Sequence, residues 1–114
     1  DVRVNYAVTL AGLNRFEEAE RQIEAAVKAD PNSPDTHNFK GTLLSRKGNR
    51  DGALSEFLEA IRLRPDFGLA HLNAARILAA KGDRAAAQQH LRQALQGSDA
   101  NIRRQAAAEL QRLQ

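Results

Sequence analysis

The chain has 114 residues, enough for one domain with a modest core. It contains no cysteine, which excludes disulfide frameworks, thiolate nucleophiles and cysteine-based zinc sites, and no apolar run approaches the roughly 20 residues of a membrane helix. Its 17 cations and 14 anions give a surface of mixed charge rather than a polyanion-binding one, so we expect neither nucleic acid nor membrane as a partner.

Helix-forming residues dominate the composition. Ala, Leu, Arg, Gln and Glu are frequent, aromatic residues make up 4% and Trp is absent, so we expect a soluble, all-α protein. The chain begins at Asp1 and holds no Met, which predicts a segment of a longer protein. Its Ala- and Arg-rich usage favours a bacterial source, where the compartment is the cytoplasm or the periplasm; the sequence does not fix which.

Amphipathic helices are predicted from segments of about a dozen residues whose apolar positions lie three or four apart. In chain order, the helices are expected at residues 2–12, 16–29, 35–47, 51–63, 69–81, 84–96 and 99–113. Turn residues separate them: Asn14, Gly48 and Gly82 mark one kind of turn, and Pro31 and Pro65 mark the other. The two kinds of turn alternate, so each repeating unit holds two helices.

A period of 34 residues runs through the chain and is clearest at its alanines. The recurring sets are Ala19, Ala53 and Ala87; Ala26, Ala60 and Ala94; Leu10, Leu44 and Leu78; and Ile23, Phe57 and Leu91. Where two antiparallel helices cross at roughly 8 to 10 Å, a methyl group fits and a longer side chain does not. The alanines are therefore predicted to lie where helices cross.

This pattern resembles the tetratricopeptide repeat, a helix–turn–helix unit with small residues at its eighth, twentieth and twenty-seventh positions. Ala7, Gly41 and Ala75 stand at the eighth position, and Pro31 and Pro65 stand at the thirty-second. The alanine sets named above occupy the other two positions. Because several positions agree at once, the resemblance is specific.

The resemblance covers almost the whole chain and implies its architecture. It implies a single domain, 1–114, with repeats at about 1–33, 34–67 and 68–98 and a capping helix at 99–113. It also implies an all-α, right-handed superhelical solenoid. In similar proteins the first helix of each repeat lines a concave groove that takes an extended peptide or a helix of a partner.

The last predicted helix has the pattern of a cap. A stack of amphipathic helix pairs leaves its last face bare, and something must cover that face. Ser98 is a candidate N-cap, and Asp99 suits the first turn. An apolar stripe is formed by Ile102, Ala106, Leu110 and Leu113. We expect a capping helix; a free amphipathic helix for a membrane or a partner is the alternative.

The groove-lining positions of the family, transferred residue by residue, give a candidate binding site. They are Val4, Asn5, Val8 and Ala11 in the first repeat, Asn38, Thr42, Ser45 and Arg46 in the second, and Leu69, Leu72, Asn73 and Arg76 in the third. Asn5 and Asn73 stand at the sixth position, where asparagine grips a peptide backbone in similar repeats, including those of the protein O-linked sugar transferases. A side-chain amide both donates and accepts, so it matches a peptide unit. Local bonding or solvent exposure of these asparagines is the alternative.

One groove chemistry of the family, the carboxylate clamp for the acidic tails of heat-shock chaperones, uses Lys, Asn, Asn, Lys and Arg. The corresponding positions here hold Val4, Val8, Phe39, Leu69 and Asn73. We therefore expect no tight binding to such tails. Apolar side chains beside a polar centre instead suit an amphipathic helix or a mixed peptide with apolar anchors.

No set of residues has the spacing of an active site, since no nucleophile stands beside a base and no glycine-rich phosphate loop is present. His37 and His71 lie one repeat apart, near a helix-packing distance of roughly 10 Å, which is too far for both to bind one metal ion. We expect no enzyme activity, no cofactor and no metal.

The expected function is that of a protein–protein interaction module, a rigid scaffold that binds a peptide or a helix of a partner protein. Two alternatives stay open. One is the substrate-recruiting arm of a larger enzyme, such as a transferase or a protease. The other is a structural assembly subunit that forms a homodimer through its first helix.

Overall fold

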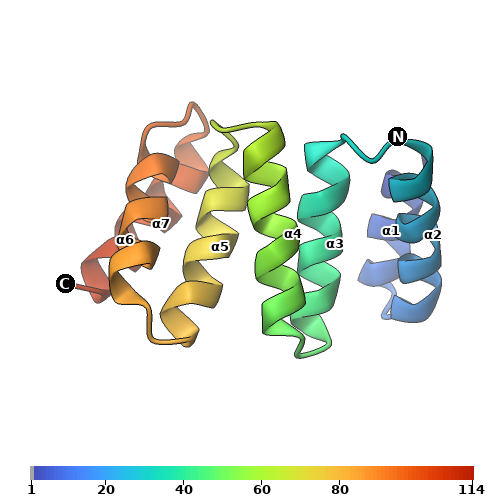
Figure 1. The fold of residues 1–114 in the computed structure, drawn as a ribbon, viewed down its shortest axis with the longest axis horizontal. Coiled ribbons are helices and arrows are strands. Elements are labelled where there is room, and N and C mark those ends of the chain that lie inside the picture. Colours follow the sequence, from blue (N-terminus) through green and yellow to red (C-terminus); the bar gives the residue numbers. More distant parts are fainter. Residues whose placement is uncertain (1) are drawn as a thin grey trace.

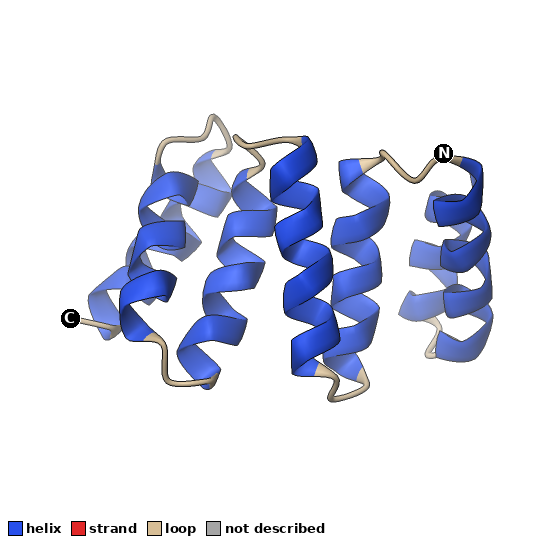
Figure 2. Cartoon of the chain, viewed as in Figure 1, coloured by secondary structure: helices blue, strands red, loops and turns tan. Residues whose placement is uncertain are grey.

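Helices make up most of the part of the chain that the computed structural model describes, residues 2–114 (Figure 1). They are α1 (Val2–Gly12), α2 (Phe16–Ala29), α3 (Pro34–Arg46), α4 (Arg50–Leu63), α5 (Gly68–Ala80), α6 (Arg84–Leu95) and α7 (Ala100–Arg112). Each boundary lies within one residue of the expected one. Residues 2–114 contain no strand (Figure 2), and the all-α expectation is confirmed.

The molecule measures 39 × 27 × 22 Å. Its helices form a stack of antiparallel pairs along the longest of these dimensions (Figure 1). α1 packs on α2, α3 packs on α4 and α5 packs on α6, and neighbouring pairs join where α2 meets α3 and α4 meets α5. α7 closes the stack by packing on both α5 and α6. The chain is therefore a helical repeat solenoid with one further helix at its end, as expected.

The turn inside each helix pair has a left-handed residue at the same step of the repeat. Asn14 has a φ of 62°, Gly48 of 85° and Gly82 of 88°. Glycine adopts this backbone region without strain, and asparagine tolerates it better than other residues with side chains. The residues that ended the predicted helices in the sequence are thus the residues that reverse the chain.

The recurring alanines lie where helices pack, as predicted. Ala19, Ala53 and Ala87 are each 0% exposed. Ala26, Ala60 and Ala94, at the other recurring position, are also buried. Larger apolar side chains from the same second helices fill the space between these contacts, and the buried residues form successive clusters along the stack. The core is therefore built by repetition rather than around one centre.

Ala53→Leu is expected to lower the free energy of unfolding by about 1–3 kcal/mol, because the added atoms have no room at the helix crossing where Ala53 is buried with Phe57, Ala74 and Ile77. Urea unfolding followed by circular dichroism measures the change. Ala85→Leu is the matched control, since Ala85 is exposed on α6. Equal unfolding midpoints for Ala53→Leu and the wild type would contradict the assignment of Ala53 to this crossing.

The second helix pair has a close contact at Gly41. A Cβ atom built on Gly41 of α3 would lie 2.6 Å from Cε1 of Phe57 on α4. The equivalent positions hold Ala7 in the first repeat and Ala75 in the third. Gly41 is therefore the small residue that makes room for the ring of Phe57, which is 2% exposed.

α7 covers the end of the stack. Its Ala106 is 0% exposed and belongs to the same buried cluster as Leu72 and Leu91. Around Ala106, its partly buried residues Ile102, Leu110 and Leu113 pack on that cluster. The capping helix is thus observed and the alternative of a free amphipathic helix is wrong. Among residues 2–114, no helix combines the length and the apolar character needed to cross a bilayer.

The N-cap of α7 differs from the prediction. Asp99, not Ser98, caps the helix: its carboxylate Oδ1 accepts hydrogen bonds from the backbone N–H groups of Asn101 at 2.9 Å and Ile102 at 3.3 Å. Both residue types suit an N-cap, so residue type alone does not choose between neighbours. The helix begins at Ala100, which places Asp99 at the N-cap position one residue before it.

Candidate functional site

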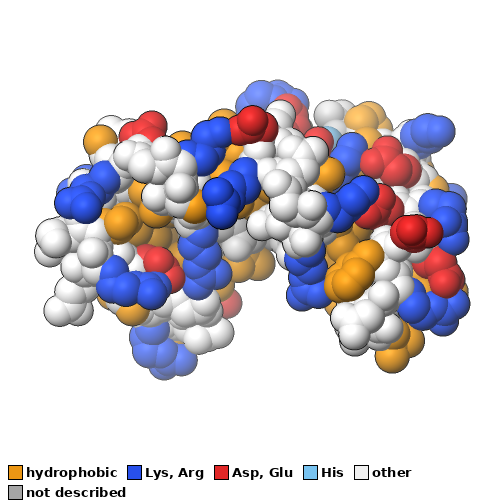
Figure 3. All heavy atoms as spheres, turned by 90° about the horizontal axis from the view of Figure 1, so that it is seen from below, with side chains coloured by type: hydrophobic (Ala, Val, Ile, Leu, Met, Phe, Trp, Pro, Cys, Tyr) orange, Lys and Arg blue, Asp and Glu red, His pale blue; other side chains and the backbone are white. Residues whose placement is uncertain are grey.

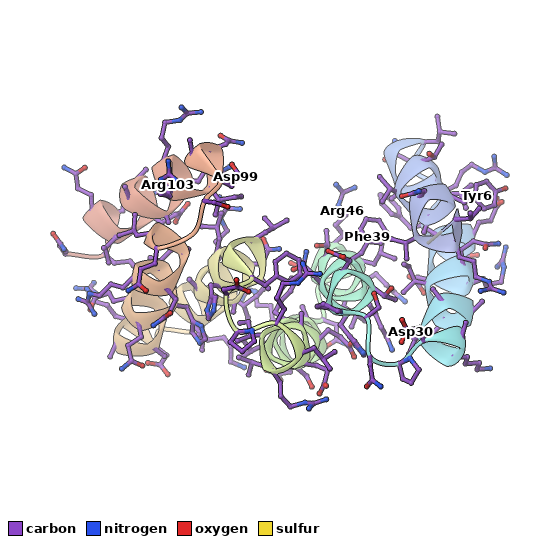
Figure 4. The ribbon with its side chains drawn as sticks, turned by 90° about the horizontal axis from the view of Figure 1, so that it is seen from above. Tyr6, Asp30, Phe39, Arg46, Asp99 and Arg103 are labelled. Carbon is purple, nitrogen blue, oxygen red and sulfur yellow. The ribbon has the colours of Figure 1, made fainter. Side chains whose placement is uncertain are left out.

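The first helices of the pairs line the hollow side of the stack. Figure 4 shows α3 and α5 at the base of this hollow, with α1 and α7 on its two sides and Arg46 projecting from α3 into it. In the same view Tyr6 lies on the far side of α1. Figure 3 shows the hollow as a notch in the lower edge of the surface. The concave face that the family resemblance implied is therefore present.

A pocket of about 250 Å³ opens between α3 and α5. The predicted site residues that line it are Thr42, Ser45, Arg46, Asn73 and Arg76. Phe57 and Ile77, which are almost wholly buried, complete its apolar lining. We call this pocket the α3–α5 pocket. Hydroxyl, amide and guanidinium groups thus stand around an apolar base, which is an arrangement suited to binding rather than to packing.

Predicted residues that share one register of the repeat differ in burial. Val4, Asn38 and Leu72 occupy one register, and they are half-buried, 7% exposed and 0% exposed respectively. Leu72 belongs to the core cluster beneath α7, so its assignment to the groove surface is wrong. Ala11, at 6% exposed, is core as well. These positions face the neighbouring first helix, which covers them.

The asparagines of the site are linked to each other. The amide nitrogen of Asn73 donates to the side-chain oxygen of Asn38 at 3.1 Å, and the hydroxyl of Thr42 donates to the backbone oxygen of Asn38 at 3.2 Å. Asn73 is half-buried and keeps its own carbonyl oxygen and one N–H for a ligand. The hydrogen bond to Asn38 therefore holds Asn73 in place. Asn5, on α1, is exposed.

Two guanidinium groups give the α3–α5 pocket its charge. The guanidinium of Arg46 lies 5.4 Å from the centre of the Phe16 ring, within range of a cation–π contact. Arg76 donates to Oε1 of Gln105 at 3.0 Å, and its Nε lies 3.6 Å from a carboxylate oxygen of Glu109 on α7. Within the described part of the chain, residues 2–114, no carboxylate lines the pocket itself.

The remaining predicted residues lie outside the α3–α5 pocket. Val8 on α1 is 49% exposed, and Val4 and Asn5 belong to the same helix. Leu69, at 38% exposed, instead lines a different pocket, between the start of α5 and the start of α7. The structure therefore gathers Thr42, Ser45, Arg46, Asn73 and Arg76 and leaves Val4, Asn5, Val8 and Leu69 outside the pocket.

Family comparison agrees with this geometry. The model of the family described as "Tetratricopeptide repeat" matches residues 7–66 and again residues 40–102. The chain belongs to the tetratricopeptide repeat family. The two overlapping matches reflect the period of the repeats, since each spans close to two repeat units.

Two curated relatives illustrate the sequence likeness. Protein FlbA of Caulobacter vibrioides is 39% identical over 71 residues, which are 62% of this chain and 12% of FlbA. The tetratricopeptide repeat and J domain-containing co-chaperone DNJ1 of Cryptococcus neoformans var. grubii is 32% identical over 89 residues, which are 78% of this chain and 17% of DNJ1. The chain thus spans a small part of either relative.

Solved structures with the same fold include two peptide complexes. The Yersinia enterocolitica type III secretion chaperone SycD, in complex with a peptide of the translocator YopD, has a TM-score of 0.87 at 16% identity over 97% of this chain and 88% of that chain. The first tetratricopeptide repeat domain of Spaghetti (RPAP3), bound to the HSP90 peptide SRMEEVD, has a TM-score of 0.86 at 16% identity over 98% and 87%. At this identity the likeness shows the fold alone. The finer likeness to sugar transferases stays a prediction.

The histidines of the second and third tetratricopeptide repeats each pair with a residue 19 positions later. Nδ1 of His37 lies 2.7 Å from Oε1 of Glu56, and Nδ1 of His71 lies 2.9 Å from Nδ1 of His90. The other ring nitrogens lie 2.7 and 2.8 Å from the backbone oxygens of the two prolines 31 and 65. Sequence reasoning missed both pairs, although the repeat already placed residues 56 and 90 in one register. Among residues 2–114, no group of three or more potential ligands could hold a metal ion.

The two pairs shift histidine pKa values in opposite directions. Burial lowers the pKa of His37, but the hydrogen bond to Glu56, the Pro31 carbonyl and the nearby carboxylates outweigh it, so this pKa is raised above the usual value. Burial, with the neighbouring His71, lowers the pKa of His90. The fold thus favours the charged form of His37 and the neutral form of His90.

His37 and His90 are therefore expected to link stability to pH with opposite signs. The contribution of His90 to the free energy of unfolding is present above its unfolded pKa of about 6.5 and is lost as the pH falls. The contribution of His37 is full below about 6.5 and is lost as the pH rises through its folded pKa. Urea unfolding at about pH 5 and about pH 7.5 measures both.

The variants His37→Gln and His90→Gln serve as each other's controls. The wild type is expected to lose stability relative to His90→Gln when the pH is lowered, and to gain stability relative to His37→Gln. The same sign of change for both variants would contradict the assignment of the two pairs.

Proposed function

We propose that this chain is a non-catalytic interaction module whose concave face binds a peptide segment or a helix of a partner protein. The observation that carries this proposal is the α3–α5 pocket, which gathers hydrogen-bonding side chains from two successive repeats on the hollow face. Two proteins of the same fold, SycD and RPAP3, are known in complex with peptides. One of the sequence relatives named above is a co-chaperone, which also supports a non-enzymatic role.

The scaffold suits this role because its binding groups are held before the ligand arrives. Asn73 is fixed by Asn38 across the α3–α5 contact, and both α3 and α5 rest on buried alanine crossings. A ligand that binds such a site orders few protein side chains, which lowers the entropic cost of binding. The exposed apolar residues Val8 and Leu69 lie on the flanks and suit apolar anchors of the ligand.

We propose that the groove does not take the acidic tail of a heat-shock chaperone. The clamp positions hold Val4, Val8, Phe39 and Leu69, none of which can form a charge-assisted hydrogen bond with a carboxylate. Calorimetric titration with the peptide SRMEEVD is expected to give no submicromolar dissociation constant. A dissociation constant below about 1 µM, or about −8 kcal/mol, would contradict this part of the proposal.

The groove assignment is tested by selecting randomised 12-residue peptides on the immobilised chain. Peptides selected on the wild type are expected to bind the double variant Asn73→Ala, Arg76→Ala about tenfold more weakly, because both substitutions remove donors that face the hollow. Arg92→Ala, on the outer helix α6, is the control and is expected to bind like the wild type. Undiminished binding to the double variant would rule out this groove.

A second candidate function is self-association through α1. Its Val2 and Leu13 are 84% and 61% exposed, and Tyr6 on the same stripe is 48% exposed. The residues 34 and 68 positions after Val2 are Thr36 and Ala70, at 1% and 0% exposed. α1 therefore presents a face that the inner repeats bury against a neighbouring helix pair, and we propose that a second copy covers it.

Light scattering over a range of concentrations tests this second candidate. The mass is expected to rise toward that of a dimer with concentration, and Tyr6→Glu is expected to remain monomeric because it places a charge in the apolar face. Val8→Glu, which faces the hollow instead, is the matched control. A mass that is independent of concentration in the wild type would exclude self-association through α1.

A further inference from the structure

We infer that the α3–α5 pocket selects an acidic side chain, Asp or Glu, within the bound segment. This inference rests on the proposed function and adds to it the chemistry of one position of the ligand. The pocket is lined by two guanidinium groups, from Arg46 and Arg76, and by the hydroxyl of Ser45, and no acidic residue among residues 2–114 lines it. A carboxylate is the peptide group that such donors match best.

Ion pairing distinguishes Arg46 from its sequence neighbour Lys47. Several cations of the chain pair with carboxylates: Arg15 with Glu18, Lys40 with Glu24, Lys47 with Glu20, Arg62 with Glu59, Arg64 with Asp35 and Lys81 with Asp51. Arg46 is next to Lys47 in sequence, yet among residues 2–114 no carboxylate pairs with it, and its guanidinium lies over the Phe16 ring. The stacked guanidinium keeps its N–H donors available in the plane of the group.

Arg76 supplies the opposite side of the pocket. Its contacts with Gln105 and Glu109 hold the guanidinium near α7 while the side chain remains 44% exposed. Glu109 is shared, since it also forms an ion pair with Arg112. The group formed by Arg76, Arg112 and Glu109 therefore carries a net positive charge. Together, Arg46 and Arg76 leave the α3–α5 pocket with a net positive charge.

The polar neighbours favour one carboxylate rather than an extended acidic run. The pocket has an apolar base of Phe57 and Ile77, and Asn73 keeps one N–H beside the guanidinium groups. An Asp or Glu side chain can reach these donors while its own aliphatic carbons rest on the apolar base. Because Val8 and Leu69 flank the site, the ligand that fits is an acidic residue between apolar anchors. Arg46 and Arg76 also stand at other repeat positions than the chaperone clamp, most of whose positions hold apolar residues in this chain.

Selection of randomised 12-residue peptides on the full 114-residue chain tests the inference. Peptides selected on the wild type are expected to be enriched in one Asp or Glu at a fixed distance from apolar residues. Selection on the charge-reversed variant Arg46→Glu, Arg76→Glu is expected to enrich Lys or Arg at that position instead. Both arginines are exposed, so circular dichroism is expected to show the wild-type helix content in this variant.

A double-mutant cycle locates the contact. Replacing the selected acidic residue by its amide is expected to weaken binding about tenfold, and Arg46→Gln is expected to do the same. The two changes together are expected to weaken binding little more than either alone, because they remove one interaction. Arg92→Gln on α6 is the control and is expected to leave the dissociation constant unchanged.

The outcomes separate the inference from the proposed function. Peptides that bind the hollow and are lost in the Asn73→Ala, Arg76→Ala variant, but show no acidic enrichment, would overturn the inference and leave the proposed function standing. Acidic enrichment with additive effects in the cycle would also overturn it, because the acid would then lie away from Arg46. If no peptide is selected above background, both the inference and the proposed function fall.

Discussion

Gly41→Ala is expected to lower the free energy of unfolding by about 1–3 kcal/mol, although the same change in an ordinary helix interior raises it by about 0.5–1 kcal/mol. The reason is the contact across the α3–α4 crossing, where the new Cβ would lie 2.6 Å from Cε1 of Phe57. The ring is 2% exposed, and a shift that relieved the contact would disturb its packing in the cluster with Ala53, Ala74 and Ile77. The sign of the change therefore distinguishes packing from helix propensity.

The chain itself supplies the compensating change. The third repeat places Ala75 where the second has Gly41, and Leu91 where the second has Phe57. Phe57→Leu alone is expected to cost about 1 kcal/mol or more through lost contacts. In the double variant, Gly41→Ala is expected to cost less than it does alone, with a coupling of about 0.5–3 kcal/mol.

Urea unfolding of the four proteins in this cycle gives the coupling directly. Additive free energies, or a Gly41→Ala protein more stable than the wild type, would contradict the view that Gly41 is required by the ring of Phe57. Either result would also weaken the account of how the second repeat is packed.

Ala106→Asp is the other change with a large expected effect, a loss of about 3–5 kcal/mol of unfolding free energy. Ala106 is 0% exposed at the centre of the face by which α7 docks, so a carboxylate there has no partner and no water. The cost is limited by the docking energy of α7, because the helix can detach instead of burying the charge. Detachment would expose the cluster that contains Leu72 and Leu91.

Ala107→Asp is the matched control for this substitution. Ala107 is the next residue of α7 and is exposed, so the change is expected to stay within about 0.5 kcal/mol. Thermal and urea unfolding of the two variants, together with binding of a hydrophobic dye, measure both the stability and the exposed cluster. Equal stabilities for the two variants would show that α7 does not cap the stack.

Much of this fold was predictable because its signals are local and repeated. The buried alanines, such as Ala53 and Ala60, recur at a fixed step, and the residues that reverse the chain, such as Gly48 and Gly82, recur with them. Repetition allows one unit to confirm another, so helix boundaries were placed within one residue. The N-cap at Asp99 was missed because no second unit shows where the last helix must start.

The site was harder to predict because exposure depends on neighbours. Leu72 shares its register with Val4 and Asn38, yet it lies beneath α7 and cannot meet a ligand. Transfer of family positions gives the register of a residue but not whether the next helix covers it. The link between Asn73 and Asn38 is likewise a contact between repeats, and residue types alone do not show which asparagines meet.

The central claim is that the hollow lined by α3 and α5 receives a peptide. Titrating a selected 12-residue peptide into the isotopically labelled chain, with backbone and side-chain amide shifts recorded, tests this most directly. The account predicts the largest shifts at Thr42, Asn73 and Arg76, which line the α3–α5 pocket. Largest shifts on the outer helices α4 and α6, with none in the hollow, would contradict it.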